Sequence, residues 1–101
     1  VKLLRPDDDA EWSYQSYVVL LDGEIVRDRV IELMAEAYVE TTIGTYACHR
    51  HPAFEPWTGG ATLPNSASHA DRSLTLPLVP GMDRDQVERV VGLLAEVIRQ
   101  A

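Results

Sequence analysis

The chain has 101 residues, of which 46% are hydrophobic and 25% charged, the size and composition of one folded domain. Its 16 acidic and 9 basic residues leave a formal net charge of −7, and its arginines form no basic stripe. This balance argues against nucleic acid and anionic membranes as partners. The single cysteine, Cys48, excludes an intrachain disulfide framework and suits a reducing cytoplasm, and no apolar run is long enough to span a bilayer.

The first half of the chain predicts a strand, a helix and a second strand. Residues 13–22 are rich in β-formers and close on a turn signal at Asp22-Gly23. Residues 26–37 place apolar side chains at helical spacing with charged residues between them, which is typical of an amphipathic helix. Residues 39–46 alternate between two faces, and Gly44 among them permits a bulge or a close backbone approach.

The next segment, residues 47–64, contains three prolines and the pair Gly59-Gly60, which indicates an irregular excursion. A loop of this length inside a compact domain is usually functional or mobile. A short helix is expected to follow over residues 65–72, capped by Asn65 or Ser66.

The end of the chain predicts a strand and a helix. Residues 74–80 are strand-like, but Pro77 restricts them to an edge strand or a strand end. Asp83 and Gln86 form a capping-box-like start for a last helix with a regular apolar stripe. We therefore expect an α/β (α+β) fold over residues 1–101, a single domain with a small three-stranded sheet and helices on one sheet face.

Four stretches carry a further pattern. They are Ser-Tyr-Gln-Ser-Tyr-Val-Val-Leu-Leu from residue 13, Arg-Asp-Arg-Val-Ile-Glu-Leu-Met from residue 27, Glu-Thr-Thr-Ile-Gly-Thr-Tyr-Ala-Cys-His-Arg-His-Pro-Ala-Phe from residue 40, and Ser-Leu-Thr-Leu-Pro-Leu-Val-Pro-Gly-Met from residue 73. In this order they resemble the C-terminal domain of the DegT–StrS family, the pyridoxal-phosphate-dependent nucleotide-sugar aminotransferases. Together they cover nearly the whole chain.

The resemblance implies a parent enzyme of fold type I, a homodimer in the cytoplasm. That enzyme would move an amino group from an amino-acid donor to a nucleotide-linked keto-sugar, with pyridoxal phosphate held as a Schiff base on a lysine. The only lysine here is Lys2, at the chain end, where a desolvated pocket is not expected. We therefore expect a C-terminal fragment without the large cofactor-binding domain, inactive by itself and without bound pyridoxal phosphate.

Two departures from the family pattern concern single positions. Gln15 stands where the family usually has His or Asn, which keeps a hydrogen-bonding side chain without a titrating one. Tyr38 stands where a Gly usually follows the helix, and a Tyr resists the left-handed backbone that this position often needs. The helix is therefore expected to end differently here.

The resemblance implies substrate-side contacts from the 46–57 loop. The residues concerned are Tyr46, His49 and Trp57 in that loop and Gln15 in the first strand-like stretch, with no catalytic or cofactor-binding residue among them. Three of them have a plainer interpretation: His49 satisfies backbone groups in its loop, Tyr46 is a strand-end aromatic, and Trp57 anchors the loop on the domain.

A metal site is not expected. Cys48, His49, His51 and His69 do not match the spacings of structural zinc sites, and in an extended segment Cys48 and His49 point to opposite faces. By the same alternation, Tyr14 and Tyr17 are expected on opposite faces of their strand.

Two other function classes stay open. The family includes members without a working lysine that act as regulators, and the chain could also be a stand-alone module that binds a ligand or a protein. A domain severed from its parent is expected to display an exposed apolar patch, which a stand-alone module is not.

Overall fold

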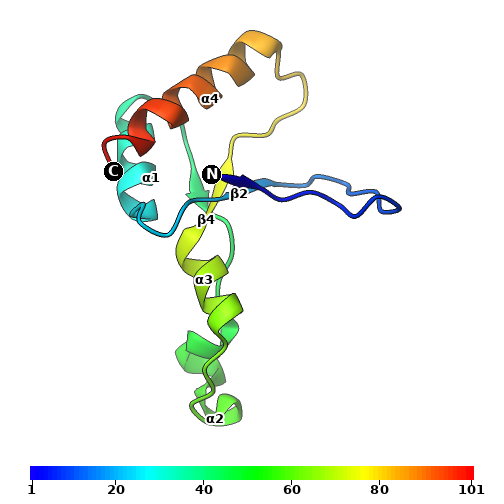
Figure 1. The fold of residues 1–101 in the computed structure, drawn as a ribbon, viewed down its shortest axis with the longest axis vertical. Helices are drawn as coiled ribbons and strands as arrows, with labels where there is room; N and C mark the ends of the chain where they lie inside the picture. Colours follow the sequence, from blue (N-terminus) through cyan, green and yellow to red (C-terminus); the bar gives the residue numbers. More distant parts are fainter.

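The computed structural model describes residues 1–101 as a four-stranded antiparallel sheet with helices on one face (Figure 1). The elements in chain order are β1 (Lys2–Leu3), β2 (Tyr17–Leu20), α1 (Arg27–Glu36), β3 (Thr42–Ile43), the 3₁₀ turns η1 (Cys48–Arg50) and η2 (Pro52–Phe54), α2 (Glu55–Thr58), α3 (Pro64–Arg72), β4 (Ser73–Leu76) and α4 (Arg84–Ile98). No helix has the length and the apolar composition needed to cross a membrane.

The strand order β1-β2-β4-β3 gives the sheet its connectivity. Both β2 and β3 are antiparallel to β4, so they run in the same direction and α1 crosses between them. The returning strand β4 then fills the gap that the β2–α1–β3 unit leaves open, which is a split β-α-β arrangement.

The core lies between one sheet face and two helices. Alternate residues of β2 and β4, such as Val19 and Leu74, pack against Val30 and Met34 of α1 and Leu94 of α4. These side chains recur at period two in the strands and at helical spacing in the helices, so each element presents a single apolar face. The predicted α/β class and the placement of helices on one face are confirmed.

The sheet has four strands, so the prediction of three was wrong. The additional strand, β1, is two residues long and pairs Lys2 with Leu20. A strand this short shows no periodicity, and its pairing depends on a segment far along the chain.

The other strands are shorter than their sequence patterns. β4 ends at Leu76, opposite Tyr17, because Pro77 has no N–H to donate to the ladder. Residues 13–16, for which a strand was predicted, therefore have no partner. The strand-end alternative for Pro77 is confirmed, whereas the edge alternative is wrong because β4 is an inner strand.

Tyr38 ends α1 in the way that a Gly would, so the prediction of a different helix end was wrong. Its φ is +60°, in the left-handed region. The N–H of Tyr38 donates to the carbonyl of Ala35, and the N–H of Val39 donates to that of Met34, both at 2.9 Å. These two bonds form a Schellman motif, with Val39 and Met34 both in the core. Burial of Val39 requires this turn, and it overrides the preference of Tyr38.

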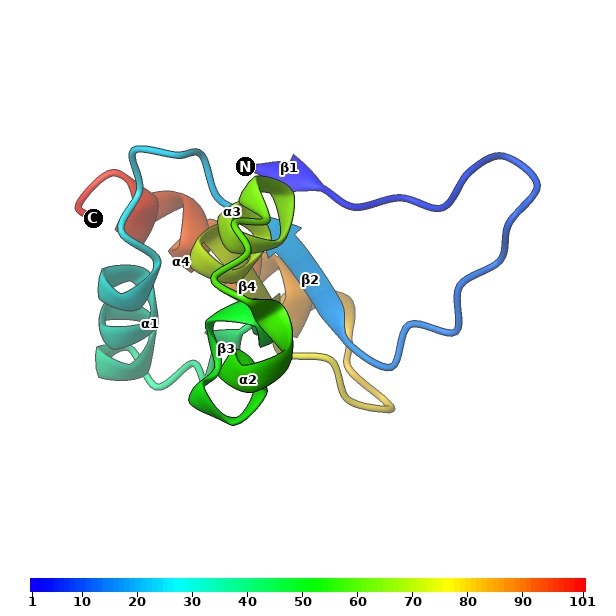
Figure 2. The same cartoon turned by 90° about the horizontal axis from the view of Figure 1, so that it is seen from below.

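Two segments project from the core. The N-terminal loop, residues 4–16, joins β1 to β2, and the arm, residues 45–72, joins β3 to β4 (Figures 1 and 2). The molecule measures 48 × 36 × 22 Å, and its radius of gyration is 15.4 Å. A compact chain of this length would have a radius of about 13 Å.

Tyr14 and Tyr17 lie on the same side, not on opposite faces as predicted. Their rings are stacked with centroids 6.2 Å apart, and Trp12 lies 5.9 Å from Tyr14. Tyr14 is outside the strand, with φ +47°, and this turn of the backbone rotates its side chain toward Tyr17.

Candidate functional site

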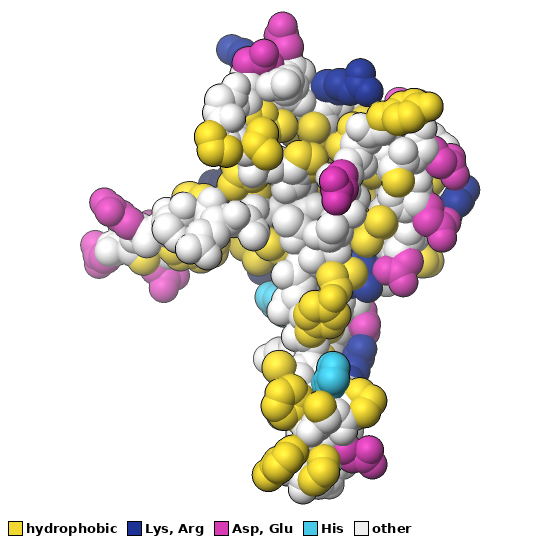
Figure 3. Space-filling view, turned by 180° about the vertical axis from the view of Figure 1, so that it is seen from behind, with side chains coloured by type: hydrophobic (Ala, Val, Ile, Leu, Met, Phe, Trp, Pro, Cys, Tyr) yellow, Lys and Arg dark blue, Asp and Glu magenta, His cyan; other side chains and the backbone are white.

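The arm carries most of the candidate residues of the sequence analysis. The predicted irregular segment 47–64 folds into η1, η2 and α2, and α3 returns the chain to the sheet. Apolar side chains gather at its far end, where Phe54 and Trp57 are exposed (Figure 3). The arm is therefore a projection with regular secondary structure and an apolar tip.

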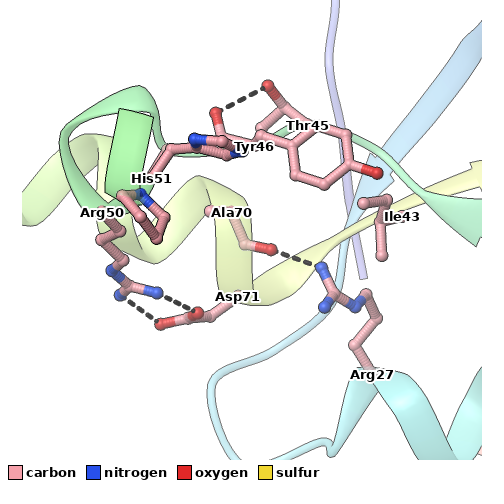
Figure 4. Close-up of a pocket in the computed structure, with 10 residues that line it drawn as sticks. Arg27, Ile43, Thr45, Tyr46, Arg50, His51, Ala70 and Asp71 are labelled. Carbon is pink, nitrogen blue, oxygen red and sulfur yellow. Dashed lines mark hydrogen bonds and ion pairs between the residues drawn. The ribbon is translucent and has the colours of Figure 1, made fainter. Parts of the chain in front are cut away.

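A cavity of about 290 Å³ lies where the arm joins the core (Figure 4). It is lined by Arg27, Ile43, Thr45, Tyr46, Ala47, Arg50, His51, Pro52, Ala70 and Asp71. Two guanidinium groups, one carboxylate, one imidazole and two hydroxyl groups therefore face one space. Such a lining suits the recognition of a polar or anionic group.

Arg50 and Asp71 form a bidentate ion pair across the cavity. Arg50 Nη1 and Nη2 donate to the two carboxylate oxygens of Asp71 at 2.7 and 2.9 Å. These hydrogen bonds lower the pKa of Asp71, with the charges of Arg50 and Arg27 adding to the effect, and the same contact raises the pKa of Arg50. Both side chains are about half exposed.

Arg27 reaches the cavity from the first residue of α1. Its Nη1 donates to the carbonyl of Ala70, while Nη2 lies 3.0 Å from the carboxylate of Asp28. The carbonyl of Ala70 is in the last turn of α3, where helix carbonyls lack an intrahelical partner. Figure 4 shows Ala70 between the Arg27 contact and the Arg50–Asp71 pair.

The arm brings three of the four predicted site residues onto one projection. Tyr46 is 76% exposed and lines the cavity at the base. His49 is half-buried in η1 and lines a neighbouring cavity of about 350 Å³ beside residues 60–64. Trp57 is 80% exposed in α2, so it is not the packed anchor of the plainer interpretation. Gln15 is exposed in the N-terminal loop, which extends in a different direction from the arm (Figure 1).

Sequence reasoning missed the charged residues of the cavity. Arg50 and Asp71 are 21 positions apart, and Arg27 lies more than 40 positions before Ala70. The only available signal was the Arg-Asp start of the second family-like stretch. His51, another missed residue, has a local role: its Nδ1 accepts from the N–H of Ala53 at 3.2 Å.

Two features of the chain bear on metal and cofactor binding, the placement of its possible metal ligands and the position of Lys2. No group of three or more His, Cys, Asp or Glu side chains is placed to hold a metal ion. Lys2 is exposed on the edge strand β1, and exposure leaves its amine without the desolvation that activates a Schiff-base lysine. Lys2 therefore does not fit the role of the Schiff-base lysine.

Comparison with known proteins defines the class. The fold matches solved structures described as aminotransferases, among them the putative sugar aminotransferase Spr1654 from Streptococcus pneumoniae in its PLP form (TM-score 0.82, 17% identity, 98% of this chain and 26% of that one). It also matches TlmJ from Streptoalloteichus hindustanus (TM-score 0.70, 28% identity, 88% and 23%). The fold is therefore that of a mixed α/β domain of an aminotransferase.

The model of the DegT/DnrJ/EryC1/StrS aminotransferase family matches residues 2–95, and the chain belongs to this family. Among curated proteins, the spore coat polysaccharide biosynthesis protein SpsC of Bacillus subtilis (strain 168) is 27% identical over 100 residues, which are 93% of this chain and 26% of SpsC. The chain spans about a quarter of the length of the relatives that it matches.

Proposed function

We propose that residues 1–101 form the C-terminal domain of a pyridoxal-phosphate-dependent sugar aminotransferase. The enzyme would transfer an amino group from an amino acid, glutamate or glutamine, to the keto group of a nucleotide-linked sugar. The observation that carries this proposal is the family match over residues 2–95. Pyridoxal phosphate supplies an electron sink when it is bound, and the rest of the enzyme would hold it.

This domain's part in the reaction is to present the arm to the substrate. Tyr46 and His49 offer a hydroxyl and an imidazole to a sugar or phosphate, and Trp57 offers a flat face for stacking on a base or sugar. Tyr46 and Trp57 are exposed on a projection beyond the core, and none of the three residues belongs to the core, which supports this role.

An apolar face supports the expectation of a larger protein around the domain. A groove of about 330 Å³ lies between the end of β4 and α4. Its eight lining residues, seven of them hydrophobic, are Tyr17, Leu76, Pro77, Leu78, Met82, Val87, Val90 and Val91. Only 14 of the 101 residues are buried. A groove of this kind is typical of a surface that packs against other protein. We propose that the groove packs against another part of the same enzyme, and that this enzyme is a homodimer in the cytoplasm.

The experiment that tests the proposal uses the native protein purified from its source. It is incubated with pyridoxal phosphate, reduced with borohydride and measured by intact mass. We expect a mass several times 11.3 kDa with one cofactor adduct on a lysine outside residues 1–101. The same enzyme should then aminate a nucleotide-linked keto-sugar when glutamate or glutamine is supplied.

The matched control is the 101-residue chain treated in the same way, which should carry no adduct and show no transaminase activity. A large native protein without an adduct would indicate a regulator that lacks the lysine. A native mass near 11.3 kDa without an adduct would indicate a stand-alone binding module. Either result overturns the proposal.

A further inference from the structure

The arm has two legs, and both meet the core at one place. The outgoing leg leaves β3 through residues 45–47, and the returning leg is α3, whose last residue Arg72 is followed directly by Ser73 of β4. No loop separates α3 from the sheet. The direction of the arm therefore depends on the contacts at this junction.

Arg72 ties the returning leg to the sheet in two ways. Its carbonyl accepts from the N–H of Leu21 at 2.9 Å, and its Nε donates to the carbonyl of Leu21 at 2.7 Å. Its Nη1 also donates to the hydroxyl of Ser68, one turn back along α3, at 3.3 Å. Main chain and side chain thus hold the last turn of α3 against the end of β2.

Arg27 ties the same turn to α1. Its side chain is only 14% exposed, and it crosses from α1 to the carbonyl of Ala70. A guanidinium group at the C-terminal end of a helix satisfies an orphan carbonyl and opposes the negative end of the helix dipole. The contact spans 43 positions of sequence, so it joins the arm to the core and not to itself.

Asp71 joins the two legs to each other. Its bidentate pair with Arg50 connects α3 to η1, which is the start of the outgoing leg. The charge of Arg27 also lowers the pKa of Asp71, so this carboxylate responds to both arginines. A bidentate pair restrains the angle between two groups as well as their distance.

We propose that Arg27 and Asp71 are positioning residues that set the direction in which the arm leaves the core, and with it the place of Tyr46, His49 and Trp57. The effect on arm direction stands on the contacts alone. The effect on the sugar substrate rests on the proposed function. Neither residue is assigned a contact with reacting atoms.

The test of arm direction uses the intact protein, in which any cysteines outside residues 1–101 are replaced. Cys48, the only cysteine of residues 1–101, then carries one spin label on the arm in η1, and dilution with unlabelled protein removes distances between molecules. Ala95→Cys adds a second label on the exposed face of α4, and the distance distribution between the labels is measured by pulsed electron paramagnetic resonance. Circular dichroism on each variant shows that the fold is kept.

We expect a single narrow distribution for the parent pair of labels and a broader or displaced one for Arg27→Met and for Asp71→Asn. Arg27→Lys, which can still donate to the carbonyl of Ala70, should recover much of the parent distribution. Arg29→Met is the matched control on the same helix, because Arg29 pairs only with Glu32 and Glu36.

An unchanged distribution in both Arg27→Met and Asp71→Asn would overturn the proposal. If Arg27→Met fails to fold, Asp71→Asn decides alone, because its ion pair is exposed and contributes little to stability. A broadened distance distribution in Arg29→Met would also count against the proposal, because the arm would then become mobile after the loss of any positive charge on α1.

A second measurement separates this inference from the proposed function. In the full-length enzyme, Arg27→Met and Asp71→Asn should raise the KM for the keto-sugar and leave the half-reaction with the amino donor at its parent rate. An enzyme without transaminase activity would defeat the proposed function and leave the arm-direction result standing. Equal losses in both half-reactions would defeat the positioning role toward the sugar.

Discussion

At the scale of single residues, Gly44 shows how closely two backbones approach in this sheet. A Cβ added to Gly44 would lie 2.6 Å from the Cβ of Ser73 and 2.7 Å from Cγ1 of Val18. Its N–H donates to the carbonyl of Ser73 at 3.0 Å, so the chain cannot move away without losing this bond. The close approach that the sequence allowed at Gly44 is therefore present.

We expect Gly44→Ala to lower the free energy of unfolding by about 1–3 kcal/mol, because the added methyl group forces Ser73 and Val18 out of their positions. Urea titration followed by circular dichroism measures the change. Gly92→Ala is the control, since Gly92 lies inside α4 with open space around its Cβ position. That change should stabilise the chain by about 1 kcal/mol, and destabilisation by both would contradict the steric explanation.

The ionisation of Asp71 should make the stability of the chain depend on pH in the acid range. The Arg50 hydrogen bonds hold its pKa in the folded chain below its ordinary value of 3.8. As the pH falls, the Asp71 carboxylate therefore takes up a proton at a higher pH in the unfolded chain than in the folded chain. The stability that the Arg50–Asp71 pair contributes is present above pH 3.8 and is lost as the pH falls through the lowered pKa of the folded chain. Unfolding midpoints measured across the acid range should fall more steeply for the parent than for Asp71→Asn. Parallel curves would show that the pair contributes nothing.

At the scale of secondary-structure elements, the end of α1 shows tertiary packing overruling local preference. Tyr38 is 95% exposed and makes no core contact, yet it holds the left-handed conformation that closes the Schellman motif. A non-glycine residue in this region is strained by roughly 1–2 kcal/mol. The strain persists because Val39 must reach the core directly after the helix.

Tyr38→Gly should therefore stabilise the chain, by about 1 kcal/mol, since the strain disappears and almost no side-chain contact is lost. Thermal unfolding by calorimetry measures the gain. Tyr46→Gly is the matched control, an exposed tyrosine without a positive φ, and it should show no such gain. A loss of stability in Tyr38→Gly would mean that the ring makes contacts important to the fold.

Elements whose ends are set by local signals could be predicted, whereas strand ends that depend on a distant partner could not. The start of α4 followed from Asp83 and Gln86, which form the full capping box, with the Asp83 carboxylate accepting from the N–H of Gln86 at 2.8 Å. Such a signal is local, so the sequence contains it entirely. Strand ends were predicted less well, because the length of β2 depends on where its partner β4 stops.

At the scale of the whole molecule, the groove beside α4 leaves an apolar surface exposed. Val87 and Val91 are 45% and 54% exposed on α4, and Leu78 and Val79 continue the apolar surface. In a solution of the isolated chain, this surface can be covered only by contact with a second copy of the chain.

We expect the isolated chain to self-associate at high concentration and Val91→Gln to reduce that association, because the change removes an exposed apolar group and keeps helix propensity. Light scattering across a concentration series measures the average mass. Val26→Gln is the control, an exposed valine that is not among the groove residues. A parent chain that stays monomeric would count against the larger enzyme that we propose.

The class of the fold, the helices α1, α3 and α4, and the resemblance to the family could all be inferred from the sequence alone. Apolar residues at helical spacing identified α1 and α4, and four short stretches in order identified the aminotransferase resemblance that the family match then established. These features are local or follow chain order, so they are available without knowing which segments meet.

The cavity at the base of the arm could not be inferred without the three-dimensional structure. Arg27, Arg50 and Asp71 come from three distant segments, and no spacing rule relates them. They meet because α3 runs without a break into β4, and β4 inserts between β2 and β3. This pairing brings the end of α3 beside the start of α1, and long-range contacts of this kind depend on strand order, which local patterns do not encode.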